Sequence, residues 1–132
     1  MITQKEWTMK TPQRGIYDIT EKIQSFVNTS PIKTGLCHVF CQHTSASLIL
    51  CENYDPEVKT DTETFLSKLV VDGHSDFIHF SEGIDAMPAH LRTMLTSSSL
   101  TLPIVNGELG LGRWQGVCLY EHRYQSIRDR LS

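Results

Sequence analysis

An Asn-Gly pair between two strand-length segments constrains the fold of this chain more than any other feature. Asn106 and Gly107 follow the alternating run 99–105 and precede the short segment 108–111. Both residue types tolerate the positive φ that a type I′ turn requires, so the pair predicts a tight β-hairpin. Another strand is expected over 114–122. The C-terminal part of the chain is therefore predicted to form antiparallel sheet.

Earlier segments add further strands. The run 36–43 is apolar at nearly every position until its last two residues, which is typical of a strand buried on both faces. Small residues at 44–47 separate it from another apolar run, 48–51, and we interpret them as a bulge or as the point where the chain changes sheet. At the N-terminus, 2–10 is expected to form an edge strand that pairs with 15–19 as a hairpin.

Three segments have helical signals. Apolar spacing predicts a helix over 20–30, which must stop near Pro31 because the residue before proline disfavours the α region. Asp55 and Pro56 suit the N-cap and first position of a longer helix, and Pro88 suits the first turn of a third. The inner face of the longer helix is expected to consist of Val58, Thr62, Phe65, Leu66 and Leu69.

These elements predict a β-rich α+β fold. We expect two packed, mainly antiparallel sheets in a β-sandwich-like arrangement, with seven to nine short strands and two or three short helices. A chain of 132 residues suits one domain spanning 1–132.

Composition excludes several classes of partner. The net charge of −3 gives no cationic field for a nucleic-acid backbone. No segment approaches the roughly 20 apolar residues of a membrane helix. The four cysteines form no Cys-x-x-Cys pair and are expected to be reduced, apolar side chains. We therefore expect a cytoplasmic protein without nucleic-acid or membrane partners.

The stretch 79–90, His-Phe-Ser-Glu-Gly-Ile-Asp-Ala-Met-Pro-Ala-His, is the densest in chemically active groups. Two imidazoles and two carboxylates lie within it. We interpret 77–80 as the end of a strand, Gly83 as part of a tight loop, and Pro88 as the start of a helix. A loop that enters a helix favours anionic ligands, because it offers free N–H groups and the positive end of the helix dipole.

Three other polar clusters lie at strand ends or helix starts. They are His43-Thr44-Ser45, Asn53 with Asp55, and Trp114-Gln115 with Glu121-His122-Arg123. A fold that packs strand ends side by side would bring these clusters to one rim. Two compatible chemistries follow: two or three histidines and a carboxylate binding Zn²⁺ or a similar ion, and Arg123 with N–H groups of 87–89 binding a phosphate.

The same motifs resemble the YjbQ family, the secondary thiamine-phosphate synthase family. The residues that carry the resemblance, between about Gly15 and Arg130, are His43-Thr44-Ser45-Ala46-Ser47-Leu48, Glu52-Asn53 with Asp55-Pro56, His79 with Glu82-Gly83 and Asp85, Met87-Pro88-Ala89-His90, Ser99-Leu100 with Pro103-Ile104, and Gly112-x-Trp114-Gln115-Gly116 with Glu121-His122-Arg123. The resemblance implies a β-sandwich-like homotrimer with a metal or anion in a polar cleft. It also implies a weak activity that joins a pyrimidine-methyl pyrophosphate to a thiazole phosphate.

The resemblance also implies roles for individual residues. The catalytic candidates are His43, Asp85, His90, Glu121 and Arg123. The substrate-binding candidates are Asn53, Asp55, Gln115 and Arg123. The candidate ligands of a divalent metal, zinc or magnesium, are His79, Glu82, His90 and His122.

One departure from the family pattern leaves other functions open. The family usually has two adjacent acids before Met-Pro, whereas this chain has Asp85-Ala86. Loss of a carboxylate favours an alternative in which the protein only binds a metal or a phosphorylated metabolite. A metal-dependent hydrolase is a further alternative.

Overall fold

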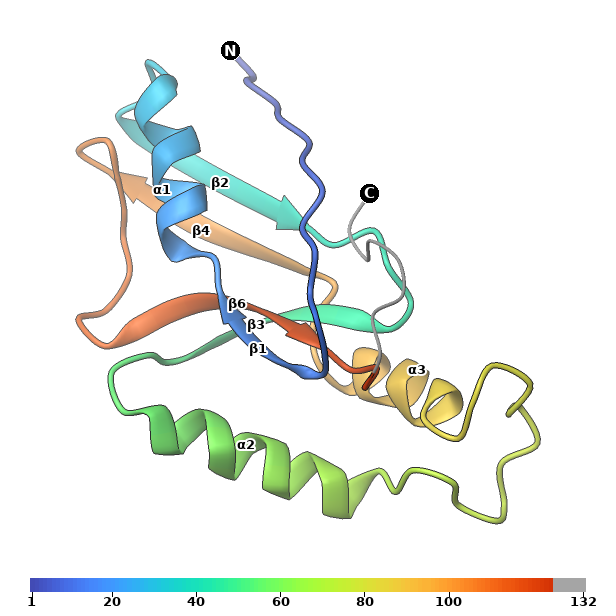
Figure 1. The fold of residues 1–132 in the computed structure, drawn as a ribbon. Helices are drawn as coiled ribbons and strands as arrows, with labels where there is room; N and C mark the ends of the chain where they lie inside the picture. The colour runs from blue at the N-terminus through green and yellow to red at the C-terminus, as the bar shows by residue number, and fades with distance from the viewer. Residues whose placement is uncertain (125–132) are drawn as a thin grey trace.

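The computed structural model describes residues 1–124, which form two three-stranded antiparallel sheets with helices packed around them (Figure 1). In chain order the elements are β1 (Gly15–Asp18), α1 (Thr20–Thr29), β2 (Thr34–Phe40), β3 (Ala46–Glu52), α2 (Pro56–Leu69), α3 (Ala86–Leu95), β4 (Ser99–Val105), β5 (Glu108–Leu109) and β6 (Gln115–Glu121). The predicted fold class, a β-rich α+β fold with two packed, mainly antiparallel sheets and two or three short helices, is confirmed.

Strand order places the first and last strands in one sheet. One sheet has the order β1-β6-β3 and the other the order β2-β4-β5. The small residues between β2 and β3 are where the chain leaves one sheet for the other, so the interpretation of 44–47 as a change of sheet is correct. Asn106 and Gly107 have φ values of 51° and 78°, as the predicted hairpin between β4 and β5 requires.

The core lies between the sheets and is closed on one side by α1. Its buried apolar side chains are Ile19, Ile23, Val27, Cys37, Cys41, Ala46, Leu48, Leu102, Ile104, Val117 and Leu119. Because side chains alternate along a strand, Cys118 and Tyr120 of β6 face away from this core. They face the side of the sheet on which α2 and α3 lie (Figure 1).

The N-terminal prediction is wrong in its pairing. Residues 2–10 form no strand, and β1 pairs with β6 instead of forming a hairpin with them. Trp7 and Met9 nevertheless pack against the core, so apolar contact holds the segment without a ladder of hydrogen bonds. Residues 77–80 also form no strand. The described residues therefore contain six strands and not seven to nine.

Two predicted buried faces are in fact exposed. In β2, Cys37 is buried whereas Leu36 and Phe40 are 72% and 60% exposed, because no layer of the described chain covers the outer face of this sheet. In α2, Leu66 is buried but Phe65 and Leu69 are exposed. An apolar pattern in the sequence predicts a face that favours burial. It does not show whether another segment of the same chain packs against that face.

Among the described residues, no helix is long and apolar enough to cross a membrane.

Candidate functional site

Three of the four predicted metal ligands come together in the structure. His79 and Glu82, in the loop before α3, lie beside His90 of α3, and one donor atom from each residue lies within 4.8 Å of the others. Nε2 of His79 is 3.5 Å from Oε1 of Glu82, and the rings of His79 and His90 are 5.3 Å apart. His79 and Glu82 are exposed and His90 is partly exposed, so the cluster is open to solvent on one side.

Backbone and hydroxyl groups from the crossing between the sheets orient His90. Its Nδ1 lies 3.0 Å from the Thr44 carbonyl oxygen and 3.1 Å from Oγ of Ser45. A carbonyl oxygen only accepts, so Nδ1 of His90 donates and Nε2 keeps a lone pair. A metal-binding histidine is typically held in this way. The predictions did not assign this role to Thr44, because a carbonyl contact across 46 residues leaves no pattern in the sequence.

The turn that holds His90 also contains His43. The backbone N–H of Ser45 donates to Nδ1 of His43 at 2.9 Å, so this nitrogen accepts and the proton of the neutral ring lies on Nε2. The structure thus brings the polar cluster 43–45 next to the stretch 79–90, as the sequence analysis predicted.

Asp85 and Arg123 form an ion pair beside the histidine cluster. Nε of Arg123 donates to Oδ2 of Asp85 at 3.2 Å, and a terminal nitrogen donates to the Glu82 carbonyl at 2.8 Å. Burial opposes ionisation of Asp85, but the Tyr124 N–H and the Arg123 guanidinium outweigh it and lower its pKa. Gly83, at φ +118°, makes room, since a Cβ there would lie 3.1 Å from Asp85 and 3.7 Å from Arg123. Asp85 therefore positions a cation next to Glu82.

Two of the three residues at 87–89, whose backbone N–H groups were expected to bind a phosphate, have no free N–H group. The N–H of Ala89 bonds to the carbonyl of Asp85, and Pro88 has no N–H to offer. The methyl group of Ala86 is completely buried. A second carboxylate at that position would need a buried hydrogen-bond partner or a metal.

Glu121 and His122 lie at the end of β6 and are completely buried, away from solvent. Glu121 accepts hydrogen bonds from the Thr11 hydroxyl at 2.7 Å and from the Arg123 N–H at 3.1 Å. His122 shares a hydrogen bond of 2.8 Å between Nε2 and Oγ of Ser47. Burial, reinforced by Arg92 and Arg14, lowers the pKa of His122 to about 3, so its ring is neutral. His122 is not a member of the His79–Glu82–His90 cluster.

Three of the four predicted substrate-binding residues, Asn53, Asp55 and Gln115, lie at the other end of the same sheet. The fourth, Arg123, lies beside the histidine cluster. Glu52 pairs with Gln115 at one end of the β3–β6 ladder, and Ala46 pairs with Glu121 at the other. Six residues of strand separate the two ends by roughly 20 Å. Asn53 donates to Asp18 at 2.7 Å, and Asp55 caps α2 by accepting from the Glu57 N–H at 2.9 Å. In this single chain the predicted site residues therefore occupy two ends and not one rim.

A buried ionic network between α2, α3 and β6 contains no predicted site residue. Arg92 is completely buried and bonds to Glu63 and to the Tyr120 hydroxyl, which donates to Glu63 at 2.6 Å. Burial would raise the pKa of Glu63, but hydrogen bonds from Ser67, Tyr120 and Arg92 lower it. Arg14 joins the network through Glu63, at 3.6 Å, and also forms a bidentate pair with Asp72 at 3.0 Å. This network supports the sheet face on which His122 lies.

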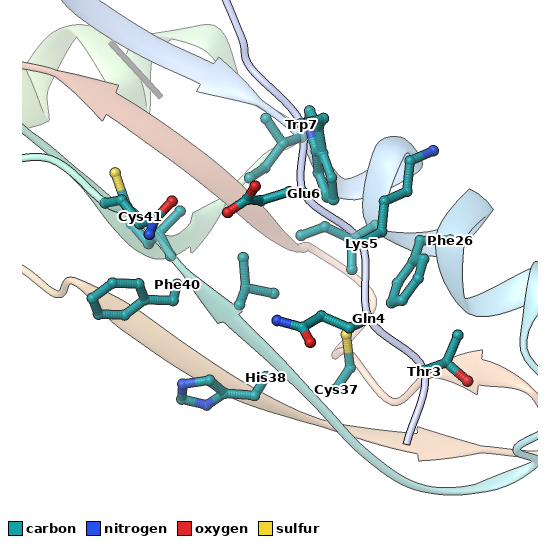
Figure 2. Close-up of a pocket in the computed structure, with 15 residues that line it drawn as sticks. Thr3, Gln4, Lys5, Glu6, Trp7, Phe26, Cys37, His38, Phe40 and Cys41 are labelled. Carbon is teal, nitrogen blue, oxygen red and sulfur yellow. The ribbon is translucent and has the colours of Figure 1, made fainter. Parts of the chain in front are cut away.

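A separate cleft of about 280 Å³ opens between the N-terminal segment, α1 and β2 (Figure 2). Trp7, Phe26, Cys37 and Cys41 line it, and Gln4 points toward it from the N-terminal segment. Among the described residues that form this cleft there is no predicted site residue. Its apolar walls continue the core.

Comparison with known proteins identifies the family. Residues 5–131 match the family model described as UPF0047 protein YjbQ-like. The chain is 52% identical over 113 residues to the UPF0047 protein sll1880 of Synechocystis sp., covering 86% of this chain and 77% of that protein. It is 40% identical over 132 residues to the UPF0047 protein YjbQ of Escherichia coli O157:H7, covering 99% and 95%.

Comparison with solved structures supports the same family assignment. A crystal structure of a YjbQ/UPF0047 family protein from Clostridium acetobutylicum has a TM-score of 0.86 at 35% identity and covers 96% of this chain and 95% of that one. The conserved hypothetical protein TT1486 from Thermus thermophilus has a TM-score of 0.83 at 33% identity, covering 96% and 94%. The chain therefore belongs to the YjbQ-like UPF0047 family.

Proposed function

We propose that this protein is an enzyme that binds a divalent metal through His79, Glu82 and His90 and acts on a phosphorylated small molecule. The observation that carries the proposal is the convergence of the three donor side chains within 4.8 Å. Two imidazoles and one carboxylate are a donor set that zinc uses when a coordination position stays open. Magnesium prefers oxygen ligands, so zinc fits these residues better.

Arg123 supports the choice of a phosphorylated substrate. Its guanidinium is held beside Glu82 by Asp85, so a fixed cation lies next to the proposed metal ligands. Arginine suits phosphate oxygens because its planar donors match their geometry. A bound metal would supply a second positive charge for the same anion.

The resemblance to the YjbQ family, which implies a weak thiamine-phosphate synthase activity, suggests the reaction. In it the thiazole nitrogen forms a bond to the methylene carbon of the pyrimidine, the carbon–oxygen bond breaks, and pyrophosphate leaves with the electron pair. Positioning and stabilisation of the departing charge would account for most of the catalysis. We assign pyrophosphate binding to Arg123, and we assign any accompanying proton transfer to His43 or His90.

Metal binding is tested by calorimetry with zinc chloride on metal-stripped protein. We expect one saturable site in the wild type and at least a tenfold weaker affinity in Glu82→Gln and His90→Ala. His38→Ala is the matched control, because it removes an exposed imidazole that bonds to Thr101. His38 lies on β2, in the sheet β2-β4-β5, and is not part of the histidine cluster. Equal zinc affinity in all four proteins would contradict the metal assignment.

The reaction is tested with both phosphorylated precursors and detection of thiamine phosphate by mass, with and without EDTA. We expect product that EDTA reduces and that Arg123→Ala abolishes. Ala86→Asp restores the family's second acid and is expected to raise turnover. Zinc binding without product, in wild type and Ala86→Asp alike, would replace the synthase with the binding-module alternative. Release of phosphate from one precursor alone would indicate the hydrolase.

We further propose that the working protein is a homotrimer whose site is shared between subunits. The predicted substrate-binding end, with Asn53 and Gln115, lies roughly 20 Å along β3 and β6 from the histidine cluster. A head-to-tail contact in a closed ring would bring one end of a subunit to the other end of its neighbour. The exposed Phe65, Leu69 and Ile78 supply apolar surface for such a contact.

A cytoplasmic location is part of the same proposal. All four cysteines are free, including two whose sulfurs are in contact, and this state suits a reducing compartment. Fractionation of cells that express the protein with an epitope tag would test the location, and recovery outside the cytoplasmic fraction would contradict it.

A further inference from the structure

Cys51 and Cys118 form a pair of thiols that the proposed reaction does not use. Cys51 lies on β3 and Cys118 on β6, and their sulfur atoms are 3.6 Å apart. Cys118 pairs in register with Ile49, and Cys51 with Gly116, so the two cysteines are diagonal neighbours on one face of the sheet. That face is opposite the core formed by Val117 and Leu119.

The two thiols differ in their access to solvent. Cys51 is partly exposed, whereas Cys118 is completely buried. Burial raises the pKa of Cys118 to about 12, and the neighbouring Cys51 contributes to the rise. Nucleophilic attack requires a thiolate, so Cys118 is a poor first nucleophile. An oxidant from solvent would therefore meet Cys51 first.

The other cysteines are placed differently. Cys37 and Cys41 lie on and just after β2, in the other sheet, and both are buried. About 13 Å of strand separates them, too far for a bond between their sulfurs. Cys41 donates to the Ala46 carbonyl at 3.6 Å, and burial raises the pKa of its thiol to about 11. This pair is therefore not placed to form a disulfide.

We infer that Cys51 and Cys118 are a peroxide-responsive site that closes to a reversible disulfide between β3 and β6. A peroxide transfers one oxygen to the Cys51 sulfur, giving a sulfenic acid, and its other oxygen leaves as water or alcohol. The Cys118 sulfur then bonds to the Cys51 sulfur, and the sulfenic oxygen leaves as water with the Cys118 proton. The two sulfurs are together oxidised by two electrons, and the peroxide is reduced.

Reversibility follows from the register. Diagonal neighbours on antiparallel strands have Cα atoms roughly 7–8 Å apart, beyond the usual range for a disulfide. Closing the bond requires the strands to shift, and a strained disulfide is more easily reduced than a structural one. The pair is thus suited to a bond that forms under oxidation and opens with a thiol reductant.

The inference is tested on the folded full-length protein with limiting hydrogen peroxide, at concentrations that leave its circular dichroism unchanged. After alkylation and digestion, we expect a peptide containing Cys51 linked to a peptide containing Cys118, and loss of this link on treatment with dithiothreitol. Cys37 and Cys41 should remain alkylatable after unfolding. Dimedone should trap a sulfenic acid at Cys51 in Cys118→Ser, whereas Cys51→Ser should form no link.

The control variant is Cys37→Ser, which should form the link as the wild type does. Mapping of the links in the wild type needs no substitution. The inference can therefore be contradicted even if a variant fails to fold. Links to Cys37 or Cys41 in comparable yield, links only between two chains, or dimedone adducts at Cys51 of the wild type without any link would overturn it.

Discussion

His122 shows how burial changes the role of a residue at the scale of one side chain. The resemblance to the YjbQ family implied that His122 is a metal ligand. In the structure its ring is completely buried, bonded to Ser47 and packed 4.4 Å from the Tyr120 ring. Two nearby arginines disfavour its protonation. A neutral, buried histidine of this kind makes folding sensitive to acid.

We therefore predict that acid weakens the fold through His122. The pKa of His122 is about 3 when folded, whereas an unperturbed histidine has a pKa of about 6.5. Between these values the unfolded chain binds a proton that the folded chain does not, so the free energy of unfolding falls as pH falls, by up to about 1.4 kcal/mol per pH unit. Urea denaturation between about pH 7 and pH 5 measures this slope above the range in which carboxylates titrate.

The matched variant for this measurement is His122→Gln. A glutamine amide can keep the bond to Ser47 but takes up no proton. Its unfolding free energy should depend less on pH over the same range. An unchanged slope in the variant would assign the acid sensitivity to other groups.

Arg92 depends on Glu63 for its charge balance. It is completely buried, and Nε and one terminal nitrogen have no hydrogen-bond partner among the described residues. Glu63→Gln should reduce the free energy of unfolding by about 3 kcal/mol, because it leaves a buried cation without its anion. Denaturant unfolding would measure the loss. Glu57→Gln on the exposed side of the same helix should change it by less than about 0.5 kcal/mol, and an equal effect of both changes would contradict the role of Glu63.

At the scale of elements, the first residues of α2 fix where the helix begins, and only part of its predicted inner face is buried. Asp55 caps the helix and Pro56 occupies its first position, as the sequence predicted. Leu66 is buried, but Phe65 and Leu69 are exposed in the single chain. Capping is decided within four residues, whereas burial of the face depends on what lies opposite it.

Asp55→Ala should therefore act mainly on the start of α2. Loss of the hydrogen bond to the Glu57 N–H is expected to cost about 1 kcal/mol of stability, measured by thermal or urea unfolding. Asp61→Ala, at an exposed position of the same helix, is the control and should have a much smaller effect. If both variants lose the same stability, the cap does not hold the helix. A change in substrate affinity in Asp55→Ala beyond this loss would support its proposed binding role.

At the scale of the whole molecule, the two polar ends of the sheet make the assembly state testable. We predict a trimer by sedimentation velocity, because a shared site needs a neighbour to bring Asn53 to His90. Co-refolding His90→Ala with Asn53→Ala should restore about a quarter of wild-type activity, the fraction of randomly formed contacts with both residues intact. A monomer in sedimentation, or inactive mixed assemblies from two active-site variants, would contradict the shared site.

The sequence by itself determined the local elements and the gathering of imidazole and carboxylate groups around the start of α3. The Asn106-Gly107 hairpin, the Asp55-Pro56 helix start and the dense stretch containing His79, Glu82 and His90 could be predicted, because each depends on residues close together in the chain. Only the tertiary structure decided that β1 pairs with β6 and that Thr44 orients His90. It also decided that His122 is buried and that Asn53 lies at the far end of the sheet. These outcomes depend on strand order and on contacts between segments that are distant in the sequence, so they cannot be predicted from short-range patterns.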